Sequence, residues 1–499
     1  MEWSFNTMPM RSIGTLLVTA FLTAMLLGPS AMEACGQAPQ QDPSQPKPAA
    51  QSIPPIGPTD QDPNADDGST PALQPDTRPL TGVQESTLGA PELLHSYFVP
   101  GLVYSNSVSS TALNQTTGSD WNSTSFIAGN VTLVKEWRHS DLSVNYTGGG
   151  FFSTADTNAS GNGSSDGYFH QFGLTQAFKW ARWELLLLDE FSYLPEAAFG
   201  FGAGTGLGEP GVGGGLASGL PGLQTGYQPS QSIFTSVGNR YTNSATAQIA
   251  YTINRRSSIN VSGSFGILRF VESGSIGTND SIFSAGYNFA VSKRNTLGVI
   301  YRFMEDRYPG NPQAVNDQVV QAAFGRKITG RLALQLFGGP NITNLRVPVG
   351  NVTQQVNFAG GATLTYALDS ARDTLLVSYN HGTSNGSGVQ IGSTLDQVEA
   401  SLSHRFSRSW VGSFNFGYAR NRSLGNPDVV QNSQSFDSYY IGGNLSHPLG
   451  RTAKLSLGYS AQIQDSNLPL CPAGTCDTNS TSHRIFGNVS WHSRPFVLR

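Results

Sequence analysis

The stretch that decides the fold is "RTAKLSLGYSAQIQ", residues 451–464. Apolar residues take every second place in it: Ala453, Leu455, Leu457, Tyr459, Ala461 and Ile463. Polar or small residues fill the places between: Lys454, Ser456, Gly458, Ser460, Gln462 and Gln464. Successive side chains of a β-strand point to opposite faces. The stretch therefore predicts a strand with one apolar face and one polar face.

The same alternation returns along the chain from about residue 95 to the end. Short turn segments join pairs of alternating runs, at 137–141, 179–183, 254–258, 292–296, 327–331, 369–373, 406–410 and 448–452. They mostly recur about every 40 residues, the period of a hairpin plus a loop. Longer connections rich in Gly, Asn, Ser and Pro lie between them. We count about eighteen strands, with short turns at one edge of the sheet and long loops at the other.

The composition fits a β-rich protein in an unusual solvent. Of the 499 residues 38% are hydrophobic and only 12% are charged, and Gly occurs 57 times. Soluble domains usually carry about 25% charged residues. The net charge of −4 is too small to indicate a nucleic acid or another highly charged partner. Beyond the N-terminus no run of apolar residues is long enough for a membrane-spanning helix.

The N-terminal segment has the features of an export signal. Arg11 precedes an apolar run over 13–27, which ends at Gly28-Pro29 and is followed by small residues. We expect a signal peptide over 1–36. Cys35 lies in a sequence similar to a lipoprotein box, but Glu33 fits that motif badly, so ordinary cleavage near Gly36 is preferred over lipidation.

Residues 37–94 are rich in Pro, Gln and Asp. Such a segment buries too little apolar surface to fold. We therefore expect three parts: the signal peptide, a disordered periplasmic tether over 37–94, and a β-domain over 95–499.

Alternation alone does not say whether the apolar face points inward, as in a sandwich, or outward, as in a membrane barrel. A barrel of this many strands is too wide to be filled by its own side chains, so its interior must be wet. The edge asymmetry is systematic, which a sandwich does not need. We therefore expect Leu455, Leu457 and Tyr459 to face lipid, while Ser456, Gly458 and Ser460 face a water-filled lumen.

Aromatic and basic residues support the barrel. Aromatic residues collect near the ends of the runs, as in two interfacial girdles: Trp137, Trp180, Trp183, Phe289, Tyr366, Phe406, Trp410 and Trp491 near the turns, and Tyr301, Phe303, Tyr418 and Tyr439 towards the loops. Many Arg and Lys residues lie in or beside the tight turns. They are either solvated turn residues or partners of phospholipid headgroups.

Residues 95–499 resemble bacterial outer-membrane porins and porin-like barrels. The resemblance rests on architecture, not on a signature motif. It implies a single closed antiparallel transmembrane β-barrel with short periplasmic turns and long external loops. Such barrels commonly end in an aromatic residue that the insertion machinery reads, and here Trp491 and Phe496 are the candidates.

The resemblance implies a passive diffusion channel for small solutes in the outer membrane of a Gram-negative-type bacterium. Its partners would be membrane lipid, the insertion machinery and the solute; nucleic acid is not expected, and a homo-oligomer stays open. The alternative is a non-conducting barrel with a structural or polysaccharide-associated role.

The alternation also assigns residues to the pore. Residues at every second place of a strand share one face, and on the face opposite the apolar residues we expect these residues to line the pore: Arg302, Glu399, Arg405, Asn415, Ser456 and Ser460. Inward charges look few, with Lys454 and Arg484 added near the rims. No charged or aromatic ladder of a sugar or phosphate pore is visible in the sequence.

The long Gly-rich stretch at 197–231 joins the fifth and sixth predicted strands. In the porins that the chain resembles, this third external loop folds into the barrel and narrows it. The expected constriction residues are Glu196, Phe199, Phe201 and Glu209, and the other interpretation is a surface loop.

We do not expect an enzyme. The segment "YNHGTSNGSG" (379–388) is superficially similar to the His-x-Ser-Asn-Gly segment of outer-membrane phospholipases. However, His381 and Ser384 are three residues apart and would lie on opposite faces of a strand. No pairing of a histidine with a carboxylate is visible, and no cofactor is expected.

Cys471 and Cys476 lie close together in "CPAGTC". In an exported protein this spacing predicts a disulfide that closes a short loop. Two cysteines without a nearby pair of histidines make a poor metal site.

Overall fold

The structure is a computed structural model. It describes residues 96–112, 121–153, 166–196, 237–271, 276–346, 352–367, 373–384, 386, 390–407, 409–424, 435–466 and 479–498. All of them belong to one compact unit, Gln61–Arg499; the other unit, Met1–Asp60, lies outside the described residues, as do the predicted signal peptide and tether. In the described part of the chain no helix is long and apolar enough to cross a membrane.

The regular elements of the described residues are strands. Their bounds are β1 (Tyr97–Ala112), β2 (Trp121–Trp137), β3 (Ser140–Ser153), β4 (Asp166–Lys179), β5 (Trp183–Glu196), β6 (Val237–Asn254), β7 (Ser257–Phe270), β8 (Thr278–Ala290), β9 (Asn295–Arg307), β10 (Ala314–Lys327), β11 (Leu332–Arg346), β12 (Val352–Ala367), β13 (Asp373–Ser384), β14 (Ser393–Arg405), β15 (Val411–Ser423), β16 (Ser435–Pro448), β17 (Ala453–Ser466), β18 (Asn479–His492) and the short β19 (Phe496–Val497).

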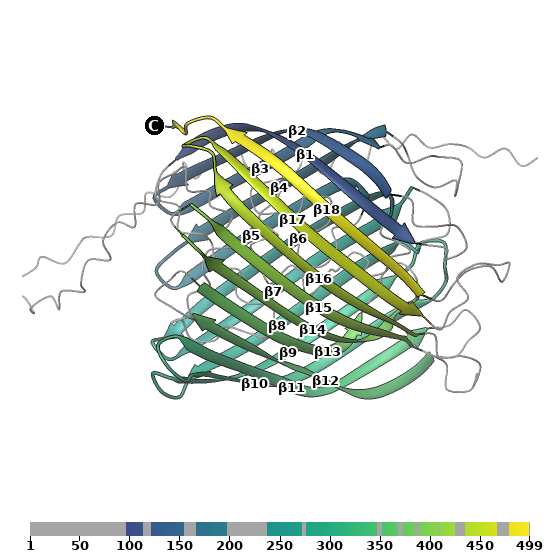
Figure 1. The fold of residues 1–499 in the computed structure, drawn as a ribbon. Coiled ribbons are helices and arrows are strands. Elements are labelled where there is room, and N and C mark those ends of the chain that lie inside the picture. Colours follow the sequence, from purple (N-terminus) through teal and green to yellow (C-terminus); the bar gives the residue numbers. More distant parts are fainter. Residues whose placement is uncertain are drawn as a thin grey trace, which may run out of the picture. The chain divides into compact units, whose positions relative to one another are not determined.

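The sheet closes on itself. From β1 to β18 each strand pairs antiparallel with the next, and β18 pairs back with β1 from Gly101↔His492 to Ala112↔Thr481. Figure 1 shows the strands running obliquely around the barrel, with β18 beside β1. The two-residue β19 continues the closure at Tyr97 and Phe98. The prediction of an all-β closed antiparallel barrel of about eighteen strands is confirmed.

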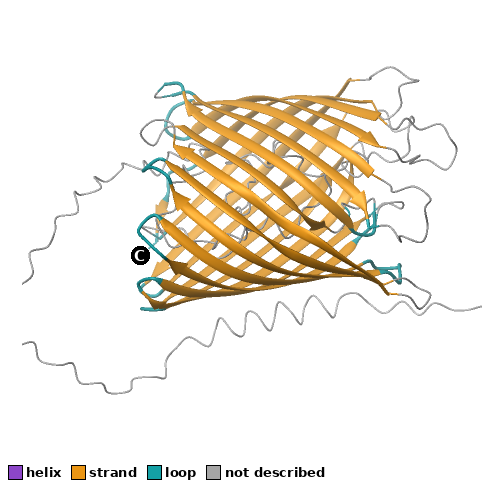
Figure 2. Ribbon diagram, turned by 90° about the horizontal axis from the view of Figure 1, so that it is seen from below, coloured by secondary structure: helices purple, strands orange, loops and turns teal. Residues whose placement is uncertain are grey.

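The two edges of the barrel differ, as the sequence predicts. Short turns join each even-numbered strand to the next one, from β2 and β3 up to β16 and β17. Figure 2 shows the described turns gathered mainly at one edge. We call this edge the turn edge and the opposite one the loop edge. Both described chain ends lie at the turn edge, because β1 starts there and β18 ends there.

One part of the wall departs from regular pairing. Between β10 and β11 the ladder omits Val320 and Gln321, where β11 carries Gly339 and Pro340. Proline has no N–H to donate to the ladder. Between β12 and β13 the pairing extends only from Ala367↔Thr374 to Gly360↔His381, although both strands continue towards the loop edge.

Candidate functional site: the inner face of the barrel

The strand quoted first has the predicted facing. In β17, Leu457 and Tyr459 are exposed on the outer surface, and Ser456 and Ser460 point to the other side of the wall. However, these two serines expose only 2% and 7% of their surface. Both side chains are therefore covered and are not open to bulk water.

The outer surface carries large apolar side chains around the barrel. Large exposed side chains include Leu102, Ile127, Val299, Leu336, Ile441 and Val489. At the turn edge Trp183 contacts Tyr251 with tilted rings whose centroids are 4.2 Å apart, and Trp410 contacts His447 at 4.5 Å. Towards the loops Tyr418 and Tyr439 lie 5.0 Å apart. This is the pattern of an apolar band between two aromatic girdles.

The predicted pore-lining residues lie on strands that are spread around the wall. Arg302 lies on β9, whereas Glu399 and Asn415 lie on the neighbouring strands β14 and β15. Glu399 accepts a hydrogen bond from Gln397, two residues along the same face. Arg405 ends β14 at the turn edge and is exposed. The structure brings Glu399 and Asn415 into one region and places Arg302 in another.

The expectation of few inward charges is wrong. The inner face also carries Asp141, Lys179, Arg240, Asp280, Asp306 and Asp317. Lys179 Nζ lies 2.9 Å from Asp141 Oδ2, and the Arg240 guanidinium lies 5.2 Å from the centre of the Phe270 ring. Most of these residues stand near strand ends, where polar residues occur on both faces. Near the strand ends, the alternation of polar and apolar residues therefore does not show which side of the wall a residue faces, unless the strand register is known.

Three of these aspartates gather on neighbouring strands. Asp280 of β8 lies directly opposite Asp306 of β9, and Asp317 of β10 lies opposite Met304, two residues from Asp306. Arg302 reaches this group, with Nη2 3.8 Å from Asp317 Oδ2. Within the described ranges no three His, Cys, Asp or Glu side chains are placed to hold a metal ion. The cluster is thus a buried, partly neutralised acidic patch of the wall.

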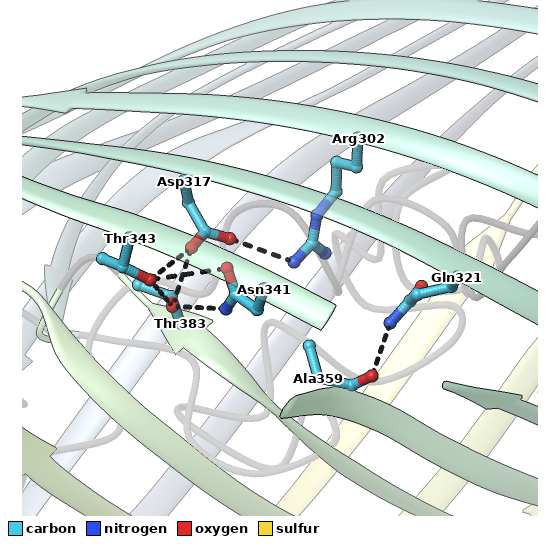
Figure 3. Close-up of polar contacts among 7 residues, drawn as sticks. All are labelled: Arg302, Asp317, Gln321, Asn341, Thr343, Ala359 and Thr383. Atoms are coloured by element: carbon cyan, nitrogen blue, oxygen red, sulfur yellow. Dashed lines mark hydrogen bonds and ion pairs between the residues drawn. The ribbon is translucent and has the colours of Figure 1, made fainter. Parts of the chain in front are cut away.

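Asp317 is the centre of the polar network in Figure 3. Its Oδ1 accepts hydrogen bonds from Thr343 Oγ1 of β11 at 2.7 Å and from Thr383 Oγ1 of β13 at 3.1 Å. Asn341 Nδ2 donates to the same Thr383 oxygen at 3.1 Å. The end of β13 is therefore bound to the inner face of β10 and β11, across the position of β12.

An apolar cluster continues this contact towards the loop edge. Tyr308, Val315 and Leu345 from the β9–β11 side pack with Leu424 beyond β15, and Ile391 packs against them. Burial raises the pKa of the Tyr308 hydroxyl well above its ordinary range. The segment before β14 and the end of β15 thus reach the inner side of β10. This contact narrows the barrel near the loop edge, and nothing in the sequence pattern indicated it.

A second apolar cluster lies on the inner wall of β1–β4. It consists of Val103, Phe126, Ala128, Phe151 and Phe169, all nearly fully buried. The rings of Phe126 and Phe169 meet edge to face at 6.0 Å. The inner side of the wall is therefore not uniformly polar, and part of it consists of packed aromatic side chains that are covered.

The expectation that no histidine pairs with a carboxylate is also wrong. His381 Nδ1 lies 2.6 Å from Asp396 Oδ1, and Tyr379 donates to the same oxygen at 3.2 Å. The partner lies on the next strand, which sequence spacing does not reveal. Ser384 Oγ is 2.7 Å from Ser393 Oγ, and the hydroxyl of Thr383, on the face of His381, bonds to Asp317. The hydroxyls beside His381 in the chain are thus engaged elsewhere.

Several predicted residues lie outside the described part of the chain. These are Phe199, Phe201 and Glu209 of the predicted constriction loop, and Cys35, Cys471 and Cys476. Glu196 is the last residue of β5, but its side chain is not described.

No protein-family model and no curated protein matches the chain. Solved structures do. OpdK of Pseudomonas aeruginosa, solved with vanillate, has a TM-score of 0.42 and 6% identity over 79% of this chain and 99% of its own. OccAB3 of Acinetobacter baumannii has a TM-score of 0.42 and 10% identity over 79% and 99%. A BenF-like porin from Pseudomonas fluorescens Pf-5 has a TM-score of 0.42 and 8% identity over 80% and 99%. Similarity this low carries no weight for function.

Proposed function

We propose that the chain is an outer-membrane β-barrel that acts as a passive diffusion channel for small solutes. One observation carries this proposal: a closed ring of eighteen antiparallel strands whose outer surface carries large apolar side chains and whose inner face carries Asp141, Arg240, Asp306 and Asp317. In hydrocarbon every backbone polar group needs a partner, and the ladders of a closed ring provide most of these partners. Bacteria place such barrels in the outer membrane, which agrees with the predicted export signal over 1–36.

A non-conducting barrel is the second candidate function, because much of the inner face is covered. Many inward side chains are covered, among them Ser456, Gln464, Phe486 and Asn488. A covered inner face favours a non-conducting barrel with a structural or polysaccharide-associated role. The two functions make opposite predictions for ion flow.

The test is single-channel recording of the purified, refolded protein in planar bilayers. A diffusion channel gives discrete, roughly ohmic current steps that grow with salt concentration. Refolded barrel that shifts its gel mobility on heating but gives no steps would reject the channel and favour the structural role.

The proposal includes a segment that constricts the channel. We place the Gly-rich connection 197–231 in the lumen as a constriction that carries Glu196, Phe199, Phe201 and Glu209. Its few charges and its many glycines suit close packing against the wall. Arg302, Glu399, Arg405 and Asn415 would then contact solute on the remaining inner face.

We further propose a disulfide between Cys471 and Cys476, in the connection between β17 and β18 at the loop edge. The support is the close spacing of the two cysteines and the predicted export. Thiol titration of the unfolded mature protein should detect these cysteines only after reduction. Two reactive thiols in freshly isolated outer membranes would refute the bond.

A further inference from the structure

The outer surface of β8–β11 changes from apolar to polar near the loop edge. Directly opposed outward residues form one row across these strands: Phe283, Phe303, Gln318 and Ile342. One step nearer the loop edge the outward row is fully polar: Ser281, Glu305, Asn316 and Asn344. Because side chains two apart share a face, both rows lie on the same side of the wall. The apolar band of the barrel therefore ends between them.

Two arginines stand on the outer surface beyond the polar row. Arg307 is the last residue of β9 and Arg346 is the last residue of β11, and both lie opposite Ala314 of the strand between them. Arg307 shares its side of the wall with Val299, and Arg346 shares its side with Leu336, which are exposed apolar residues. Both arginines are exposed. Two strand spacings, about 10 Å, separate their backbones.

A third guanidinium is fixed beside them. Arg269 of β7 lies opposite Tyr241, which is exposed on the outer surface. Its Nη1 donates to two backbone carbonyls at 2.7 and 2.8 Å, and its Nη2 donates to Asn279 Oδ1 at 2.6 Å. Asn279 in turn lies directly opposite Arg307. These acceptors are neutral, so they orient the guanidinium without cancelling its charge.

We call Arg269, Arg307 and Arg346 the arginine rim. The acidic side chain beside it on the outer surface is Glu305, whose Oε1 lies 3.0 Å from Arg307 Nε and 2.9 Å from Arg307 Nη2. One carboxylate thus accompanies three guanidinium groups among the described outward residues of this sector. The sector therefore carries an excess of positive charge at the end of the apolar band.

The corresponding zone on β14–β16 has a different charge pattern. Asp396, Arg420 and Asp437 follow one another in directly opposed positions, on the side of the exposed Phe414. Arg420 Nε lies 3.6 Å from Asp437 Oδ1, and Arg422 Nη2 lies 3.7 Å from Asp396 Oδ2. Each arginine of this zone has a carboxylate close by, so the charges balance. The positive excess is thus a property of the β7–β11 sector.

We propose that the arginine rim binds the phosphorylated headgroup of an anionic glycolipid in the outer leaflet of the membrane. Guanidinium groups bind phosphate through paired, charge-assisted hydrogen bonds, and the amides of the polar row can donate to and accept from sugar hydroxyls. The order arginine, amide, apolar side chain along the wall matches the order phosphate, sugar, acyl chain. The apolar row favours a lipid over a free phosphate ion. The proposal rests on the outer-membrane location proposed above.

The experiment measures binding of fluorescently labelled diphosphoryl lipid A to the refolded barrel in micelles of a zwitterionic detergent, by fluorescence polarisation. The site variant is Arg307→Gln/Arg346→Gln. The matched control is Arg420→Gln/Arg422→Gln, which removes the same charge from the balanced zone of the outer surface. Heat-modifiable gel mobility shows that each variant is folded.

The wild-type barrel should bind the lipid, and the site variant should bind it about tenfold more weakly, since two charge-assisted contacts to phosphate are lost. The control variant should bind like the wild type. Equal weakening in both variants would mean a general effect of net charge and would overturn the site. A folded wild-type barrel that binds no lipid A would overturn it as well.

Two further ligands identify the group that is recognised. Lipid A without its phosphates should bind more weakly than the diphosphoryl form, and equal binding of the two would contradict the role of the arginines. Inorganic phosphate should not displace the lipid at equal concentration; displacement would mean a site for the free anion. If the double variant does not fold, Arg346→Gln alone, at the last residue of β11, decides by the same comparison.

Single-channel recording of the same wild-type protein separates the glycolipid site from the channel. A barrel that conducts but does not bind lipid A refutes the site and leaves the channel. A barrel that binds lipid A through the arginine rim but does not conduct refutes the channel and supports the site.

Discussion

At the residue scale, the facing of each side chain decides what a substitution costs. Phe414 and Asn415 are neighbours on β15, and they lie on opposite sides of the wall. Phe414 is exposed on the apolar outer surface, and Asn415 is half-buried on the inner side. This pair isolates the effect of facing, because position along the strand is nearly the same.

Phe414→Arg should destabilise the inserted barrel by about 2–4 kcal/mol, because a guanidinium facing the hydrocarbon loses its hydration. Asn415→Arg should cost much less. Urea unfolding from lipid vesicles, followed by tryptophan fluorescence, measures both. Equal losses for the two variants would contradict the assigned faces.

A second residue-scale effect concerns the buried charge of Asp317. This side chain is fully buried, and its partner Arg302 is 14% exposed. Asp317→Ala removes the carboxylate that lies 3.8 Å from the buried Arg302 guanidinium, and it removes the acceptor of Thr343 and Thr383. Breaking such a pair on one side costs about 3 kcal/mol or more.

The double variant Arg302→Met/Asp317→Ala should therefore be more stable than the sum of the two single losses implies. The same urea unfolding experiment gives the coupling energy. Strictly additive losses would show that the two charges do not depend on each other.

At the element scale, the glycines of β11 and β12 lie where neighbouring backbones approach closely. Their segments are "FGGPNI" (337–342) and "FAGGAT" (358–363). Glycine in a strand usually weakens it, but here it lets two backbones approach closely. These close approaches and the early end of the β12–β13 ladder occur at the same level.

Gly361→Ala should lower the stability of the barrel, because the added methyl meets the Tyr379 carbonyl and, at 2.4 Å, the Phe337 ring. Gly263→Ala on β7 is the control, since nothing lies within 4 Å of its added methyl. The temperature at which the folded gel band converts to the unfolded band reports both. A Gly361→Ala barrel as heat-resistant as the control would mean that the wall relaxes at no cost.

At the scale of the whole barrel, the inner face decides what passes. The apolar contact of Tyr308, Val315, Leu345 and Leu424 narrows the bore from one side. The aromatic cluster of β1–β4 occupies another part of the wall. The proposed constriction by 197–231 would act between these surfaces.

Deleting residues 203–225 should raise single-channel conductance clearly if that connection lies in the lumen, because the narrowest part of a pore dominates its resistance. Heat-modifiable mobility of the deletion variant controls for folding. Unchanged conductance of a folded variant would reject the inward loop and leave it a surface role.

The sequence by itself determined the barrel. The alternation in 451–464 and its repeats define the strands, and the tight turns give the antiparallel order. The assignment of Leu457 outward and Ser456 inward follows from the same period. These features are local, since each depends on neighbours in the chain and on the two-residue period of a strand.

Only the tertiary structure decided what the strands bring together. The pairing of His381 with Asp396, the acidic group of Asp280, Asp306 and Asp317, and the end of the β12–β13 ladder at Gly360 all depend on register between strands. For the same reason, the sequence predicted too few charged residues on the inner face. Parity fixes a side, but it does not say which residues of other strands lie opposite, or where a ladder stops.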